Sequence, residues 1–257
     1  MRATPKRLSR TAIFLTLLAI TGVIYSYTIF SNFCMDQDTL NYVTSPELLK
    51  GDLSFLNCIG MKGWFAKFHL FMFSLVYLVT KAYSFWGGWD FLVGFKICTL
   101  ICAIFTIAIL YFICKNTMRR FYIVLAISFI PLYVLGYSWL ITTCDDNALA
   151  NFFNLLFLAS LLIATGAVAP AKRESHCYLW ALLTGITAGL SMASHLKNIV
   201  ALPIILALVM VKPPPRRSRL CIAAAGFLGL LLTFGLMYWI YWIQSTGEPV
   251  ASKIDFW

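Results

Sequence analysis

Long apolar runs, each about the length of a membrane-spanning helix, recur along most of the chain. The run at 91–114 contains a single charged residue, Lys96, and crossing a bilayer takes about 20 consecutive apolar residues. Backbone groups inside lipid find no water to bond, so a spanning segment must satisfy its own hydrogen bonds, as a helix does. A β-barrel would show short segments of alternating polarity instead. The pattern therefore predicts an all-α integral membrane protein.

Composition supports the same class. Of the 257 residues, 61% are hydrophobic and only 12% are charged. A soluble protein of this size needs more polar surface to cover its core. We therefore expect one transmembrane helical domain over residues 1–257, inserted without cleavage of its first apolar run.

Seven apolar stretches are predicted to span the membrane. They are residues 11–31, 91–114, 121–143, 148–169, 178–195, 198–211 and 220–243. An eighth stretch, 65–86, is interpreted as a helix lying along the membrane surface within an outer loop, 32–90. Lysine and aromatic side chains at both of its ends suit the headgroup level. If this stretch spanned the membrane, the arginine clusters of later loops would face outward, against the positive-inside tendency.

The charges sort to opposite sides of the predicted membrane. With seven spans and a cytoplasmic N-terminus, every arginine falls inside, and every acidic residue except Glu174 falls outside. The net charge of +10 is therefore interpreted as a topology signal rather than a nucleic-acid site. We expect a multi-pass protein of the plasma (inner) membrane, within the cell envelope, whose tail at 244–257 is extracytoplasmic. Cys34 and Cys58 share the outer loop, where a disulfide is chemically allowed.

Two acidic pairs are candidates for chemistry at the outer face. Asp36 and Asp38 follow the first span closely, and a carboxylate near an apolar boundary can serve as a general base. The pair could also hold a divalent cation through its oxygens, or it could be an ordinary solvated loop end. Asp145 and Asp146 precede the fourth span, where one acid is expected to cap the helix and the second could support a site.

Cationic residues near the same face form a third candidate. His195 and Lys197 fall at the tip of the hairpin between two predicted spans, and Lys96 lies inside the second span. A lysine within a span usually faces the bundle interior, although Lys96 could instead extend to the headgroups. Such a cationic pocket would suit a substrate carrying phosphate. His69 could contribute to it or could simply anchor the surface helix.

In their order along the chain, these pieces resemble the membrane glycosyltransferases of the GT-C superfamily that use polyprenyl-phosphate sugars, such as protein O-mannosyltransferases and aminoarabinose transferases. Those proteins carry an Asp-rich motif after the first span, often continued by a Tyr and an A-x-x-L-L-x-G stretch. Here Asp36-Gln37-Asp38 continues through Tyr42 to Leu48-Leu49-Lys50-Gly51. A His entry to a surface helix follows at His69-Leu70, without the family's prolines, and Lys96 stands where the family has an Arg.

The resemblance continues in the second half of the chain. Asp146-Asn147-Ala148-Leu149 with Phe152-Phe153 is similar to the family's D-x-L…F start of a span. Gly185 to Leu190 is similar to the G-x-x-x-G-L stretch, and His195 then occupies the family's Lys position, with Lys197 two residues beyond. The chain stops after seven spans, whereas family members continue with further spans.

The resemblance implies a function. One of Asp36 and Asp38 would act as the general base, and Lys96, His195, Lys197, His69 and Tyr42 would bind the donor. Asp145 and Asp146 would support them. The donor would be a polyprenyl-phosphate-linked sugar, and the acceptor a lipid, glycan or protein. A partner chain could supply missing helices. The alternatives are a non-catalytic or degenerate subunit of this kind and a small-solute transporter.

Overall fold

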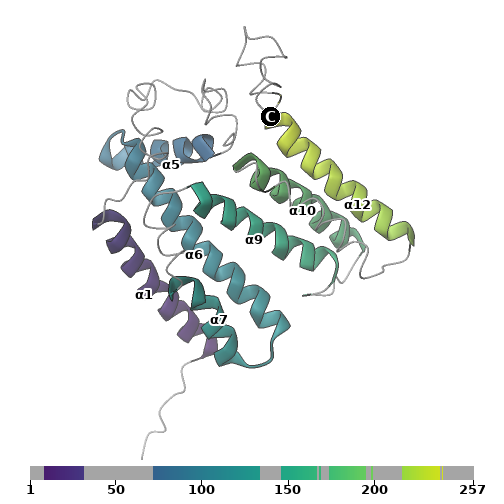
Figure 1. Ribbon diagram of the computed structural model, residues 1–257, viewed down its shortest axis with the longest axis horizontal. Helices are drawn as coiled ribbons and strands as arrows, with labels where there is room; N and C mark the ends of the chain where they lie inside the picture. Colours follow the sequence, from purple (N-terminus) through teal and green to yellow (C-terminus); the bar gives the residue numbers. More distant parts are fainter. Residues whose placement is uncertain are drawn as a thin grey trace, which may run out of the picture.

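The computed structural model describes residues 9–31, 72–133, 146–166, 168, 174–194, 198, 216–237 and 239, and every regular element in these parts is a helix (Figure 1). The helices are α1 Arg10–Ser31, α5 Met72–Gly87, α6 Phe91–Thr117, α7 Phe121–Tyr133, α9 Asp146–Ala164, α10 Glu174–Ser194 and α12 Arg216–Leu230. A π-helical turn, Leu231–Gly235, continues α12. The prediction of an all-helical protein is confirmed for these parts of the chain.

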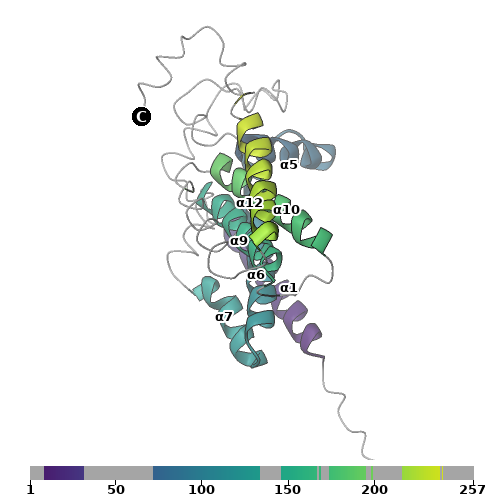
Figure 2. The same ribbon diagram turned by 90° about the vertical axis from the view of Figure 1, so that its right-hand side faces the viewer.

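Five of the helices form a row in the order α1, α6, α9, α10 and α12, as Figure 1 shows and the packing between neighbours confirms. Viewed from the side, in Figure 2, the helices of this row lie one behind another. Helices α5 and α7 both pack on α6. Helix α6, at 27 residues, is about 40 Å long at 1.5 Å per residue, which is enough to cross a bilayer.

The contacts also fix the direction of each helix. Phe14 stacks on Tyr111, and Phe30 lies near Lys96, so α1 and α6 are antiparallel. Likewise Ser160 lies beside Thr187, and Asn154, earlier in α9, bonds Ser191, later in α10. Helices α9 and α10 are therefore antiparallel as well.

Helices α10 and α12 run parallel, because Gly185 approaches Gly226 and Gly189 approaches Thr233. Helix α10 therefore ends, and α12 begins, at opposite ends of the bundle. The span predicted at 198–211 would make that crossing, but apart from Asn198 it lies outside the described residues, and the count of seven spans stays a prediction.

Helix α5 lies across the row rather than along it (Figures 1 and 2). It crosses α6 at Gly94, where an added Cβ would collide with the Thr80 hydroxyl, and Thr80 is fully buried. Asp90 then starts α6, its carboxylate accepting a hydrogen bond of 3.0 Å from the Val93 amide. This crosswise course suits the predicted surface helix, although no membrane boundary is defined by the helices themselves.

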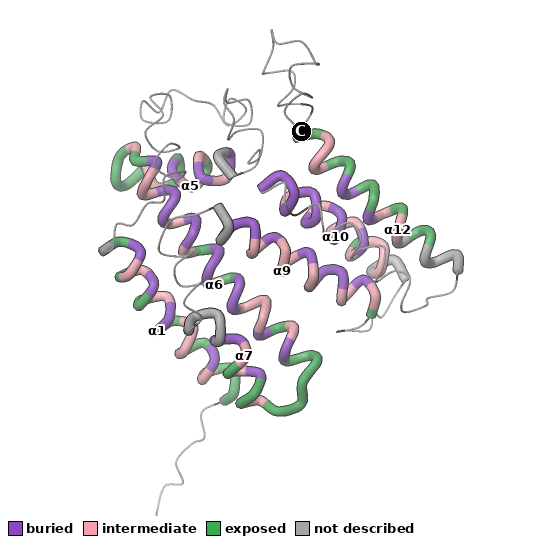
Figure 3. Tube along the Cα trace, viewed as in Figure 1, coloured by how far each residue is buried: buried purple, intermediate pink, exposed green. Residues whose placement is uncertain are grey.

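Three helical segments in the described parts are long and apolar enough to cross a membrane, namely Arg10–Phe30, Phe91–Thr117 and Cys177–Ser194. Leu149–Ala164 and Ala223–Gly235 are shorter apolar helices. Large apolar side chains are exposed along α1 and α12, at the two edges of the row (Figure 3). In water such faces would be costly, whereas lipid accepts them. These features support a helical membrane protein.

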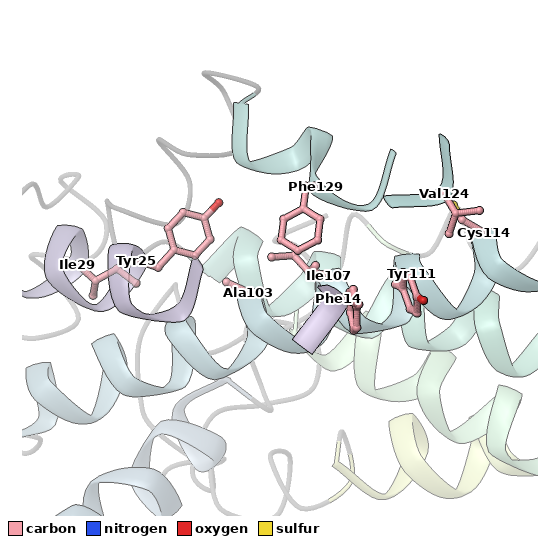
Figure 4. Packing of buried hydrophobic residues seen from close by; sticks show 9 residues of the cluster. All are labelled: Phe14, Tyr25, Ile29, Ala103, Ile107, Tyr111, Cys114, Val124 and Phe129. Carbon is pink, nitrogen blue, oxygen red and sulfur yellow. The ribbon is translucent and has the colours of Figure 1, made fainter. Parts of the chain in front are cut away.

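A cluster of aromatic and aliphatic side chains joins α1, α6 and α7 (Figure 4). Its members are Phe14, Tyr25, Ile29, Ala103, Ile107, Tyr111, Cys114, Val124 and Phe129. The Phe14 and Tyr111 rings are stacked with their centroids 3.7 Å apart, and Phe129 meets Phe14 edge-on. A second cluster joins α5, α6 and α9, and a third joins α9, α10 and α12. Each helix of the row is therefore tied to its neighbours by apolar packing.

Glycines line the contact between α10 and α12. A Cβ added at Gly185 would collide with the Gly226 carbonyl oxygen, and one added at Gly229 with the Leu182 carbonyl oxygen. Small residues let two helix backbones approach closely, which is the main source of helix association inside lipid. The Gly185-to-Leu190 stretch therefore has a packing role that is independent of any catalytic one.

We expect Gly185→Ala to lower the midpoint of thermal unfolding of the purified protein, because the methyl group has no room beside the Gly226 carbonyl. Overpacking of this kind typically costs about 1–3 kcal/mol. The matched control is Gly235→Ala, since a Cβ there meets nothing within 4 Å. Equal midpoints for the two variants would contradict the close α10–α12 contact.

Candidate functional site

Lys96 is the predicted site residue whose side chain the structure describes. It lies in the second turn of α6 and is only 7% exposed, so it points into the bundle rather than toward surrounding lipid. Its ammonium nitrogen is 5.7 Å from the centroid of the Phe30 ring, near the end of α1. A cation over an aromatic face is attracted by the ring quadrupole. Its low exposure favours a position inside the bundle over extension toward the headgroups.

The ends of several helices lie at the same end of the row as this lysine. Helices α1 and α10 end, and α6 and α9 begin, at the same end of the row, with α5 lying across it (Figure 1). This is called the Lys96 end. The opposite end, where α1 begins, α6 ends and α7 begins, is called the Arg10 end. The segments that carry the other predicted site residues leave the described helices at the Lys96 end.

A polar network at the Lys96 end joins α9 to α10. The Ser191 hydroxyl donates to the Asn154 side-chain oxygen at 2.6 Å, and the Asn154 amide donates to the Asn198 side-chain oxygen at 3.1 Å. The Asn198 amide in turn donates to the Ser191 carbonyl oxygen at 3.1 Å. Interhelical bonds of this kind typically add about 0.6 to 2 kcal/mol each in a membrane. They fix Asn198 beside the last turn of α10.

The remaining predicted site residues fall outside the described part of the chain. Asp146 is the first residue of α9, as the helix-start prediction required, but its side chain is not among those described. The others outside are Asp36, Asp38, Tyr42, His69, Asp145, His195 and Lys197. Cys34 and Cys58 lie outside as well. The described helix ends that flank these residues therefore lie at one end of the row, the end at which Lys96 also lies.

Within the described residues, no three His, Cys, Asp or Glu side chains lie close enough to hold a metal ion. Two of the three cysteines of α6, Cys98 and Cys102, are buried and pack in the cluster between α5, α6 and α9. They behave as small apolar residues, as their i,i+4 spacing in an apolar run predicts.

Sequence reasoning missed two features of this end. Asn154 is one of two asparagines, with Asn151, inside the apolar run 148–164, and a polar side chain in such a run was the signal for interhelical bonds. Phe30 gave no signal, because one more aromatic side chain in a spanning helix is unremarkable until Lys96 is seen beside it.

Comparison with known proteins adds no relative from which function could be transferred. No protein-family model matches the chain, and no curated protein or solved structure matches it significantly. The function must therefore be argued from the chain's own residues.

Proposed function

We propose that this protein is a membrane glycosyltransferase, or the helical module of one, that moves a sugar from a polyprenyl-phosphate carrier to an acceptor hydroxyl on the outer face. The proposal rests on the order of the motifs in the sequence and on the buried position of Lys96 at the end of the bundle from which the motif-bearing segments leave.

The burial of Lys96 is the observation that carries most weight. A charged side chain inside an apolar helix costs about 3 kcal/mol or more in lipid, and it is retained mainly where it serves a substrate or an ion. Lys96 lies in the second turn of α6, which begins at Phe91. A phosphate group entering from the outer face would reach it at about headgroup depth.

The proposed reaction is a single displacement. Asp36 or Asp38 takes the proton of the acceptor hydroxyl, and the hydroxyl oxygen bonds to the anomeric carbon of the sugar. The bond from that carbon to the phosphate oxygen breaks, and polyprenyl phosphate leaves as an anion. Lys96, with His195 and Lys197, would stabilise the charge on the departing phosphate, which is commonly the largest single contribution to catalysis.

The direct test uses the full chain in proteoliposomes, with a radiolabelled polyprenyl-phosphate mannose and a polyprenyl-phosphate aminoarabinose as donors. Release of sugar above that of protein-free liposomes, to water or to an added acceptor, is the expected result. Donor binding without release would identify the non-catalytic subunit instead. Solute uptake that is unaffected by Asp36→Asn, with no release, would favour the transporter.

A further inference from the structure

A second cationic feature lies at the Arg10 end, away from Lys96 by most of the length of α6. It is a pocket of about 520 Å³ between the start of α1, the last turns of α6 and the start of α7. Pockets that hold small ligands typically measure about 300 to 1,000 Å³. Nothing in the proposed transfer reaction uses this pocket, so its role is a separate question.

The floor of the pocket is rigid and apolar. Tyr111 and Val124 line it, and both belong to the buried cluster that joins α1, α6 and α7. Tyr111 stacks on Phe14 of α1, and Figure 4 shows the two rings next to each other. Because these side chains are 9% exposed or less, the floor is held in place by the bundle itself.

The walls of the pocket are positively charged. Arg10, Lys115 and Arg119 line it, and none of its ten lining residues is acidic. The Arg10 guanidinium carbon lies 5.4 Å from the centroid of the Phe121 ring, and the Lys115 ammonium nitrogen lies 5.9 Å from that of Tyr111. Cation–π contacts of this kind favour positions of the two cations over the rings.

The connection between α6 and α7 sets the position of the third cation. Helix α6 ends at Thr117, and the Met118 amide donates to the Cys114 carbonyl oxygen at 2.8 Å. Only three residues separate the two helices, and Arg119 is the middle one. Its neighbour Arg120 has the same charge but does not line the pocket.

We propose that this pocket binds a phosphate group, carried either by an anionic lipid headgroup or by a soluble phosphate. Guanidinium groups match the geometry of phosphate oxygens, and basic pockets between transmembrane helices on the cytoplasmic side hold anionic headgroups. A topology signal requires only positive charge in a loop. Such a signal does not require Arg10, Lys115 and Arg119 to line one cavity beside Tyr111. A role in setting the membrane orientation therefore does not by itself account for this cluster of cations.

Binding of dioctanoyl phosphatidylglycerol to the purified full-length protein tests the proposal, with dioctanoyl phosphatidylcholine as the neutral reference. We expect Arg119→Gln to weaken phosphatidylglycerol binding about tenfold, because the variant loses a charge-assisted hydrogen bond to the phosphate, and tenfold corresponds to about 1.4 kcal/mol. The matched control Arg120→Gln removes the same charge one position away and should change binding less than twofold. Equal thermal midpoints without ligand establish that both variants are folded.

A parallel titration with inorganic phosphate identifies the source of the phosphate group. If phosphatidylglycerol binds in preference to phosphatidylcholine and inorganic phosphate does not displace it, the ligand is a lipid headgroup. If phosphate alone stabilises the protein and Arg119→Gln removes that effect, the ligand is soluble. The proposal is overturned if the wild-type protein shows neither effect, or if Arg120→Gln weakens binding as much as Arg119→Gln.

Discussion

The double substitution Asp36→Asn with Asp38→Asn is expected to reduce sugar transfer to the background rate while leaving the amount of protein in the membrane unchanged. An amide cannot accept the hydroxyl proton at neutral pH, and a positioned general base typically contributes about 100- to 10,000-fold to a rate. The two single variants should identify which carboxylate is the general base, because substitution of the other acid will lower the transfer rate less. The measurement is initial rate in proteoliposomes at saturating donor.

Asp90→Asn is the matched control for this experiment. Asp90 is also an acid on the predicted outer side, but its described role is to cap α6 through the Val93 amide, and Asn caps a helix about as well as Asp does. Asp90→Asn should therefore keep nearly full activity. If the double variant at Asp36 and Asp38 also transfers sugar at the wild-type rate, these residues are not the catalytic base.

The second large effect is expected at Lys96. Lys96→Met keeps the length and apolar stem of the side chain but removes its charge, and we expect kcat/KM for the polyprenyl-phosphate donor to fall about 100-fold or more. Loss of one such electrostatic group typically costs about 100- to 1,000-fold. Lys96→Arg should retain most of the activity, because guanidinium also pairs with phosphate.

Two further readouts separate a role in catalysis from a role in folding. Removing a buried charge could stabilise the bundle, so the thermal midpoint of Lys96→Met should be equal to or above that of the wild type. Lys81→Met, at an exposed position on α5, should leave both activity and midpoint unchanged. If the Lys96→Met protein is folded and fully active, Lys96 does not bind the donor phosphate.

Much of the architecture could be predicted because lipid imposes a simple rule. A segment such as 91–114 has no water to bond, so its length and apolarity were enough to predict a helix, and α6 runs from Phe91 to Thr117. The start of α6 was also foreseeable in principle, since Asp90 precedes the apolar run and caps it. The expectation that 65–86 differs from the spans matches the crosswise course of α5.

What could not be predicted depends on contacts between distant segments. The close approach of α10 to α12 needs glycines at matching heights on two helices, and nothing in the stretch around Gly185 alone says which helix it will meet. The pocket at the Arg10 end was missed for the same reason. In the sequence, Arg10 and Arg119 were each interpreted as part of the positive charge that sets the orientation of the protein in the membrane. Only the packing of α1 and α7 against α6 shows that both residues line one cavity.

The site and the pocket both depend on which end of the bundle faces outward, and the native cysteines can test this. A membrane-impermeant maleimide, applied to sealed right-side-out vesicles and followed by peptide mass spectrometry, should modify Cys144. It should leave Cys177 and the exposed Cys221 unmodified until the vesicles are permeabilised. Modification of Cys177 and Cys221 in sealed vesicles, with Cys144 protected, would reverse the orientation and contradict both assignments.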